Sequence, residues 1–295
     1  MMKRKGLICL AICVLVCLGI VSLLLFKEKL SRKLNMVCYD KKEQIIYSYG
    51  NDRILLENVI NPFWTEEYIL GIYDDGEKTF IGKYSLNGEK WEELFPISLL
   101  YESMNKEMDA GSIYNIRIKS DGTLTFIYDG KIYSYDSDER KIELVETTTG
   151  VHKFEWMDEN TLFILSEWEK LQIGKLEKYN LLTGDREFLN DSVADFACLQ
   201  EENRILYSKK YFMGSWTEYE LYSTDVASLE NIRKKRYRTI SVGNILGNSG
   251  NEVYVIESEL SLNDKLAVYY INDDNLIPIY VTKMQGSCIG IFNEP

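Results

Sequence analysis

Short runs of apolar and aromatic residues, separated by polar turns, dominate the chain from Asn35 onward. Apolar and polar residues alternate within many of these runs, which is typical of β-strands with one buried face. The clearest pair covers 123–128 and 131–135 and is joined by Asp129-Gly130. Glycine accepts the positive φ of a tight hairpin turn, so this dipeptide predicts a hairpin. Long helical periodicity is missing, and the pattern therefore predicts an all-β domain.

The same hairpin scheme recurs along the chain. Strand pairs are predicted at 68–73 with 80–84, 161–165 with 174–179, 204–208 with 218–222, and 252–256 with 266–270. The second strand of each pair ends in a tyrosine, at intervals of 51, 44, 43 and 48 residues: Tyr84, Tyr135, Tyr179, Tyr222 and Tyr270. A polar turn follows each tyrosine, and in most units a third strand comes next. A period in the forties with three or four strands per unit predicts a β-propeller.

The two ends of this region predict how the ring closes. A sixth unit is expected from strands at 36–39, 44–49 and 53–56. The tail at 287–292 would add a strand to that unit. We therefore expect six blades, with five or seven left open.

Two segments carry a resemblance to a known family. Ser120-Asp-Gly-Thr-Leu-Thr-Phe126, followed by Ile132-Tyr-Ser-Tyr-Asp136, resembles the repeat of TolB-like propellers. Those repeats have a Ser-x-Asp-Gly turn before one strand and an Ile-Tyr-x-x-Asp strand after it. The turn at 179–184 is similar to another that such repeats often carry. The resemblance spans most of 36–292 with degenerate repeats, and it implies a fold rather than an activity, because propellers host many functions.

The N-terminus predicts a membrane anchor. An uncharged apolar run of 21 residues, 6–26, lies between basic flanks, and this length suits a helix crossing about 30 Å of hydrocarbon. A cleaved signal peptide usually has a shorter apolar core and a small-x-small site, which this run lacks. We expect residues 1–5 in the cytoplasm, a signal-anchor helix at 6–26, a juxtamembrane linker at 27–34 and the propeller at 35–295. The basic flanks do not fix the orientation, but a short basic N-terminus favours an extracytoplasmic domain on a single-pass cell-membrane protein.

Charge excludes one class of partner. Residues 1–33 hold seven bases and one acid, which leaves 27 bases and 45 acids in the rest and a net charge of −18. So acidic a domain repels phosphate backbones, and we expect no nucleic-acid binding.

The cysteines do not form a metal motif. Cys9, Cys13 and Cys17 recur every four residues and lie on one stripe of the predicted membrane helix, either as apolar filler or as a helix-packing face. Cys38, Cys198 and Cys288 lack the close pairs of a zinc site. We expect buried free thiols, with a disulfide between Cys38 and Cys288 left open.

No catalytic constellation is recognisable in the sequence. His152 is the single histidine, and we expect it at a rim or in a loop rather than in catalysis. Acidic turns at 136–139 and 272–275 lack the full calcium-loop order, and we expect no metal and no cofactor. A glycosidase pair needs two carboxylates in one cleft, which sequence does not reveal.

Two local features are candidates for partner binding. Five bases in six residues stand out in an acidic domain: Arg233, Lys234, Lys235, Arg236 and Arg238. The alternative is an outer strand or loop that balances nearby acids. The second feature is an aromatic cluster between two strands of a hairpin: Tyr211, Phe212 and Trp216. Exposed aromatic side chains often anchor partners, although packing between blades would also explain them.

These observations favour a membrane-tethered, extracytoplasmic propeller that binds a protein, peptide or glycan without catalysing a reaction. One alternative is a cell-surface carbohydrate-active enzyme with paired carboxylates at the propeller axis. Another is an accessory subunit of a membrane signalling or transport complex, packed through the cysteine stripe.

Overall fold

The computed structural model describes residues 34–293 except for 49–52, 65–67, 86–89, 105–108, 120, 147–149, 168–171, 214–215, 227–234, 238–241, 250–251, 258–264, 273–274 and 284–287. Residues 36–292 form one compact unit. The expected membrane helix at 6–26 lies outside the described residues, as does the N-terminus at 1–5. None of the described helices is long and apolar enough to cross a membrane.

Antiparallel sheets make up nearly all of the described chain. The first sheet has the order β23-β1-β2-β3, with β1 (Leu34–Asp40), β2 (Ile45–Ser48), β3 (Arg53–Leu56) and β23 (Cys288–Asn293). The second contains β4 (Val59–Trp64), β5 (Tyr68–Asp74), β6 (Thr79–Ser85) and β7 (Lys90–Pro96) in sequential order. The third contains β8 (Ile113–Ile118), β9 (Leu124–Tyr128), β10 (Lys131–Asp136) and β11 (Lys141–Glu146). The short helices α2 (Ile97–Met104) and η1 (Ala110–Ser112) connect the second and third sheets.

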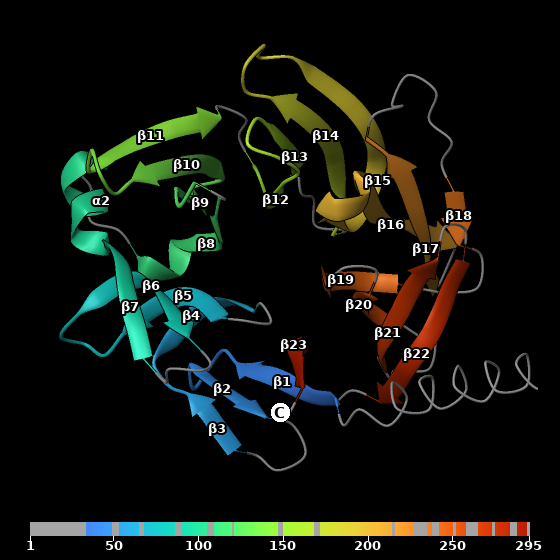
Figure 1. The fold of residues 1–295 in the computed structure, drawn as a ribbon, viewed down its shortest axis with the longest axis horizontal. Coiled ribbons are helices and arrows are strands. Elements are labelled where there is room, and N and C mark those ends of the chain that lie inside the picture. The colour runs from blue at the N-terminus through green and yellow to red at the C-terminus, as the bar shows by residue number, and fades with distance from the viewer. Residues whose placement is uncertain are drawn as a thin grey trace, which may run out of the picture. The chain divides into compact units, whose positions relative to one another are not determined.

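The fourth sheet is larger than the others. It has seven strands in sequential order: β12 (Lys153–Trp156), β13 (Thr161–Ser166), β14 (Gly174–Asn180), β15 (Arg186–Leu199), β16 (Arg204–Met213), β17 (Trp216–Asp225) and β18 (Lys235–Tyr237), with η2 (Gln200–Glu202) between β15 and β16. The last sheet contains β19 (Val242–Ser249), β20 (Glu252–Glu257), β21 (Lys265–Asn272) and β22 (Asn275–Lys283). Figure 1 shows the sheets grouped around a common centre, with β8, β12 and β19 among the strands nearest to it.

The described residues form five separate sheets, one fewer than the six blades expected, although the sequence had left five open. The fourth and fifth sequence units share one sheet because β15 is continuous over 14 residues. Its first half pairs with β14 and its second half pairs with β16, with irregular register on both sides of Val193. The two halves pack against each other through one core cluster, which includes Phe163 and Leu176 from one half and Phe196 and Tyr207 from the other.

The strand pairs expected from the tyrosine repeat are confirmed. Each pairs in register as an antiparallel hairpin: β5 with β6, β9 with β10, β13 with β14, β16 with β17, and β20 with β21. In the clearest hairpin, Asp129 and Gly130 both have positive φ, of 49° and 67°, as a two-residue turn requires. The expected closure is also confirmed, because β23 pairs with β1 in the first sheet.

The hydrophobic core lies between successive sheets. Side chains alternate between the two faces of a strand, so a middle strand can contact both neighbouring layers. On β13, Leu162 shares a cluster with Ile127 of the preceding sheet, whereas Phe163 shares a different cluster with Phe196. Every residue of β13 is buried for this reason. Burial on both faces explains why these strands appear as continuous apolar runs in the sequence.

Candidate binding site

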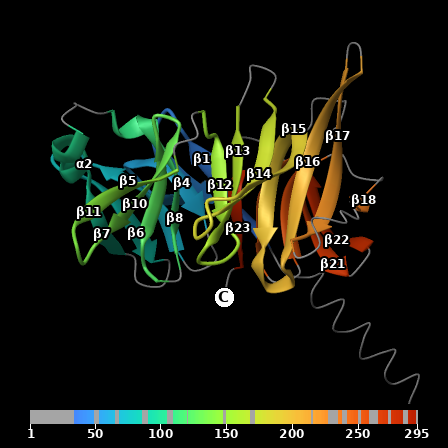
Figure 2. The ribbon, with the colours of Figure 1, turned by 90° about the horizontal axis from the view of Figure 1, so that it is seen from above.

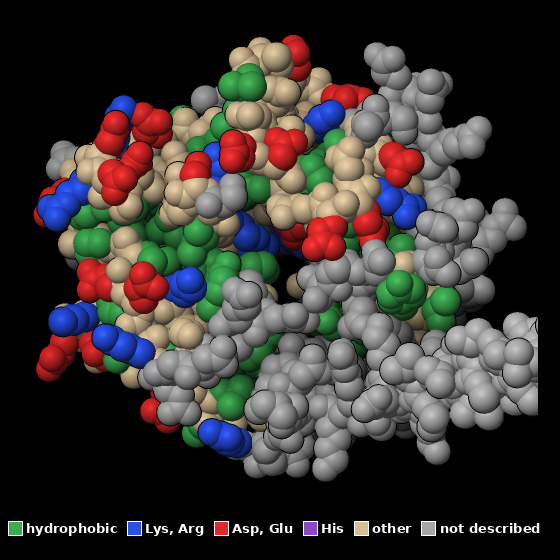
Figure 3. All heavy atoms as spheres, in the orientation of Figure 1, with side chains coloured by type: hydrophobic (Ala, Val, Ile, Leu, Met, Phe, Trp, Pro, Cys, Tyr) green, Lys and Arg blue, Asp and Glu red, His purple; other side chains and the backbone are tan. Residues whose placement is uncertain are grey.

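A cavity of about 540 Å³ is lined by strands of the second, third and fourth sheets. Its wall includes Phe63 of β4, Arg117 of β8, Lys153 of β12, Asp195 of β15 and Tyr219 of β17. Figure 3 shows a hollow near the centre of this face, with Lys and Arg side chains on its wall. The volume is in the range of cavities that hold small ligands or short chain segments.

Asparagine residues bend the strands that line the cavity. Asn61 and Asn115 adopt left-handed backbone conformations, with φ of 50° and 52°, at register irregularities in β4 and β8. Asparagine tolerates this conformation better than most residues. The side chain of Asn61 donates hydrogen bonds through Nδ2 to the carbonyl oxygens of Ile113, at 2.7 Å, and of Gly111, at 3.0 Å. Each bend thereby directs a polar side chain to the next sheet.

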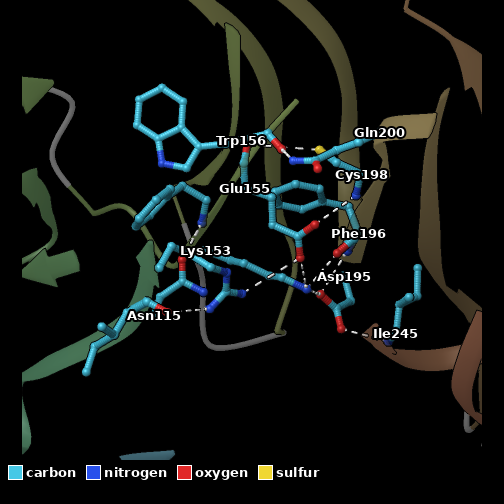
Figure 4. A network of polar contacts seen from close by, with 12 residues as sticks. Asn115, Lys153, Glu155, Trp156, Asp195, Phe196, Cys198, Gln200 and Ile245 are labelled. Carbon is cyan, nitrogen blue, oxygen red and sulfur yellow. Dashed lines mark hydrogen bonds and ion pairs between the residues drawn. The ribbon is translucent and has the colours of Figure 1, made fainter. Parts of the chain in front are cut away.

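Four charged side chains form a continuous network that joins the third sheet to both halves of the fourth, as Figure 4 shows in part. Lys153 Nζ lies 2.7 Å from Asp195 Oδ1 and 3.3 Å from Glu155 Oε1, and it donates a further hydrogen bond to the Phe196 carbonyl at 2.6 Å. Arg117 Nη2 lies 3.8 Å from the same Glu155 oxygen. These charged side chains are only 12–18% exposed, so their interactions are weakly screened by solvent.

The same carboxylates also bind backbone N–H groups of the following strands. Glu155 Oε2 accepts from Cys198 N and Asp195 Oδ2 accepts from Ile245 N, both at 2.8 Å. Asn115 Oδ1 similarly accepts from Phe154 N at 2.9 Å. The inner strand of a blade has an edge without a strand partner, and its N–H groups need acceptors when they are buried. Side chains of one layer provide acceptors for the next.

Burial and charge perturb the ionisable groups around the cavity. Burial lowers the pKa of Arg117 below its usual value, and the nearby carboxylates of Glu155 and Asp195 only partly oppose this. Burial also acts to lower the pKa of Lys153, but the same two carboxylates outweigh it and the pKa is raised. Burial raises the pKa of the Cys198 thiol well above its usual value, so this cysteine stays protonated.

His152 lines this cavity, although its side chain is exposed. It immediately precedes β12, and its backbone N–H donates to the Leu165 carbonyl at 2.8 Å. Burial of part of the ring lowers the pKa of His152 below 6.5, and Asp195 opposes the shift. The position at a strand end beside a cavity agrees with the expected rim location.

The aromatic residues expected to bind a partner lie on a two-stranded extension of the fourth sheet. β16 and β17 pair as far as Met213 and Trp216, whereas β15 accompanies β16 only to Lys209 and β18 pairs with β17 only at 221–223. Figure 2 shows this extension reaching beyond the neighbouring strands. We call residues 210–219 the aromatic ribbon. Phe212 is 47% exposed on it, and Tyr211 is partly buried.

The aromatic ribbon is connected to the cavity. Lys210 Nζ lies 5.4 Å from the ring centroid of Phe212 and 5.7 Å from that of Tyr219, and Tyr219 lines the cavity wall. Tyr211 Oη lies 3.2 Å from Tyr222 Oη. Trp216 is the first residue of β17.

The basic segment is only partly described. Arg233, Lys234 and Arg238 lie outside the described residues. Lys235 and Arg236 belong to β18, the last strand of its sheet, where they pair with Ser223 and Tyr222 of β17. A role of this segment in partner binding stays a prediction.

The structure describes the side chains of two of the three cysteines that lie beyond the apolar run at 6–26. Cys38 and Cys198 are free and buried, as expected. Cys288 begins β23, the neighbour of the strand that carries Cys38, so the two chain ends do meet in one sheet. Among the described residues, no cluster of His, Cys, Asp or Glu is arranged to hold a metal ion.

The sequence did not single out the residues of the charged network. Arg117, Lys153, Glu155 and Asp195 lie on the first strands of the units, whereas the tyrosine repeat marks the second and third strands. A usable signal is present, because Lys153 and Glu155 alternate with the buried Phe154 and Trp156. Charged residues at alternate positions of a strand that precedes a buried hairpin indicate a polar axis.

Comparison with known proteins identifies the architecture. No family model matches the sequence, and neither does any curated protein. The chain is similar in structure to TolB from Acinetobacter baumannii, at 13% identity over 90% of this chain and 67% of TolB, with a TM-score of 0.57. The chain is a β-propeller.

Two further solved structures share the propeller fold. One is from a nidogen/laminin complex, at 10% identity over 88% of this chain and 97% of that chain, with a TM-score of 0.57. The other is puromycin hydrolase, at 11% identity and a TM-score of 0.53. That match covers 84% of this chain and 43% of the hydrolase. At such low identity, these similarities establish the fold alone.

Proposed function

We propose that this propeller is a membrane-tethered, extracytoplasmic binding module that takes up part of a protein, peptide or glycan partner in its axial cavity. The observation that carries the proposal is the cavity of about 540 Å³, whose wall is built by the inner strands. Rigid strands hold its polar side chains in fixed positions, which lowers the entropic cost of binding.

The contacts that Glu155 and Asp195 make with the protein favour binding over catalysis. Glu155 and Asp195 both contact the Lys153 ammonium, and both also accept a hydrogen bond from the backbone of a following strand. A general acid or base must exchange a proton with a substrate held within hydrogen-bond reach. Carboxylates whose oxygens are already bonded to the protein are suited to fixing the strands. The axial pair therefore gives little support to the alternative of a carbohydrate-active enzyme.

The aromatic ribbon supports a surface that extends beyond the cavity. Tyr219 belongs to both, and the exposed Phe212 lies in the next-to-last residue pair of the same hairpin. A two-stranded ribbon is marginally stable by itself, so contact with a partner would stabilise it. We assign Tyr211 and Phe212 to the rim of the binding surface and the cavity to its centre.

The membrane tether comes from the sequence. The apolar run at 6–26 has the length of a membrane helix, and the short basic N-terminus favours export of the domain. In this arrangement the propeller would meet its partner outside the cytoplasm. An accessory role in a membrane complex, through the stripe of Cys9, Cys13 and Cys17, would add a second contact within the bilayer.

Filling the cavity tests the proposal. Ala194 lies on the cavity wall and carries no charge, so Ala194→Trp would occupy the space while leaving the ionic network in place. We would probe the labelled full-length chain, solubilised in detergent, on peptide and glycan arrays. Array members that bind the wild type should lose binding to Ala194→Trp and keep it with Lys175→Gln, a change on an exposed side chain of β14. Equal binding by wild type and Ala194→Trp would refute an axial site.

A further inference from the structure

Arg117 is the charged group of the cavity with the least complete pairing. Its Nη1 donates a hydrogen bond to the Ile116 carbonyl at 3.0 Å. Its nearest carboxylate oxygen, on Glu155, lies 3.8 Å from Nη2, which is too long for a hydrogen bond. Within the described part of the chain, these are its polar contacts, although a guanidinium has five N–H donors. Its other N–H groups are not among the described buried atoms without a partner, and Arg117 lines the cavity.

The ammonium of Lys153, by contrast, has an oxygen atom near each of its three donors. Lys153 has three donors, and it contacts Asp195 Oδ1, the Phe196 carbonyl and Glu155 Oε1 at 2.7, 2.6 and 3.3 Å. The carboxylates of Glu155 and Asp195 therefore contact the Lys153 ammonium and backbone N–H groups more closely than they contact Arg117. Arg117 keeps free donors on the cavity wall, although its side chain is only 12% exposed.

The surroundings of Arg117 hold the guanidinium in position. Its Cζ lies 3.5 Å from the ring centroid of Phe63, a cation–π contact that covers one face of the planar group. Its edge carries the N–H donors that have no hydrogen-bond acceptor among the described residues. A planar guanidinium fixed in this way matches the two oxygens of a carboxylate, with which it forms paired hydrogen bonds.

We propose that the axial cavity captures the C-terminal carboxylate of a peptide, with Arg117 as its principal donor. This proposal rests on the binding function proposed above and specifies the ligand group. The carboxylate would complete the hydrogen bonding of a guanidinium whose charge the protein compensates only at a distance. His152, at the cavity wall, becomes a second cation below its lowered pKa, so binding should strengthen as the pH falls toward that value.

The charge of the domain favours a peptide terminus over an acidic polysaccharide. Residues beyond 33 carry a net charge of −18, which repels a chain with a negative charge on every repeat. A peptide tail with one terminal carboxylate meets much less repulsion. The C-terminal group also extends from the end of its chain and can enter the cavity without a bend in the chain.

The test compares ligands that differ in one functional group. A peptide library with free C-termini and the same library with C-terminal amides would be measured against the full chain, together with a uronate oligosaccharide and its reduced neutral form. We expect the free acids to bind at least about tenfold more tightly than the matched amides, as for hydrogen bonds to charged groups. In Arg117→Gln this ratio should fall to about one, while the weaker binding of the amides stays unchanged and reports an intact fold.

Each result has a separate meaning. Equal binding of acids and amides, or an unchanged ratio in Arg117→Gln, would overturn carboxylate capture and leave the proposed binding function intact. Preference for the uronate over the peptide acids would assign Arg117 to a glycan and also overturn the proposal. If the wild type binds none of these ligands, including the amides and the neutral sugars, the binding function itself is refuted. Arg117→Lys should retain charge but lose the paired geometry, giving an intermediate ratio.

Discussion

Replacing Lys153 with methionine would remove the central cation of the charged network. The substitution conserves most of the side-chain length and takes away the group that contacts Asp195, Glu155 and the Phe196 carbonyl. Two carboxylates would then lie in a poorly solvated region with Arg117 as their remaining cation, 3.8 Å from one of them. We expect a large loss of stability and no change in the fold of the individual sheets.

The magnitude follows from burial. Removing one partner of a buried ion pair costs about 3–5 kcal/mol, because the other charge stays desolvated without compensation. Lys153 and Asp195 are 15% and 16% exposed, so we expect a value near the lower end, about 3 kcal/mol. With a urea m-value of about 3 kcal/mol/M for a domain of this size, the unfolding midpoint should fall by about 1 M.

A matched control separates burial from the loss of an ion pair. Lys175 lies 2.6 Å from Glu167, a distance similar to that of Lys153 from Asp195, but these side chains are 45% and 59% exposed. Lys175→Met should therefore shift the unfolding midpoint much less than Lys153→Met does. Urea unfolding of the two variants and the wild type, followed by tryptophan fluorescence, gives the comparison. If Lys153→Met is no more destabilising than Lys175→Met, the network does not hold the layers together as argued.

Three further substitutions test other features. Burial raises the pKa of Tyr207 from 10.0 to about 12. The tyrosine therefore contributes stability, on the order of 3 kcal/mol, that is complete below pH 10 and is lost as the pH rises through about 12. In urea titrations, Tyr207→Phe should lose about one proton's worth of pH dependence across this window, and equal slopes would contradict the burial argument. Asn115→Ala leaves Phe154 N–H without its acceptor and places alanine at φ 52°, so it should cost about 2–4 kcal/mol in urea unfolding, whereas Asn115→Asp should cost much less. Gly174→Ala would place a Cβ in steric conflict with the Ser166 carbonyl oxygen and should lower stability by about 1–3 kcal/mol. A thermal melt would detect the loss, and an unchanged melting temperature would refute it.

The repeated hairpins were predictable because their physical causes are local. Alternation, turn residues and burial on both faces leave direct marks in the sequence, as in β13 and in the Asp129-Gly130 turn. The pairing of β23 with β1 was also predictable, since the tail completed a unit that lacked a strand.

The inner strands and the site were less predictable. β4 contains a proline and a left-handed asparagine, so its pattern of apolar residues does not show a regular strand. The fusion of two units through β15 depends on a bulge near Val193 rather than on composition. The contacts of Lys153 join residues 42 and 43 positions apart, and proximity of this kind arises only after the layers have packed. The helix α2 is short and lies in a connection, where no repeat pattern indicates it.

The pairing of β23 with β1 also determines when the first sheet can be completed during synthesis of the chain. During synthesis, β1 is among the first described strands to leave the ribosome and β23 is the last, so the first sheet lacks a strand until β23 has been made. Contacts between segments so far apart in sequence form slowly, because a long loop must close first. Until then β1 presents an open edge to other chains, and a premature stop anywhere before β23 would leave that edge permanently available for aggregation.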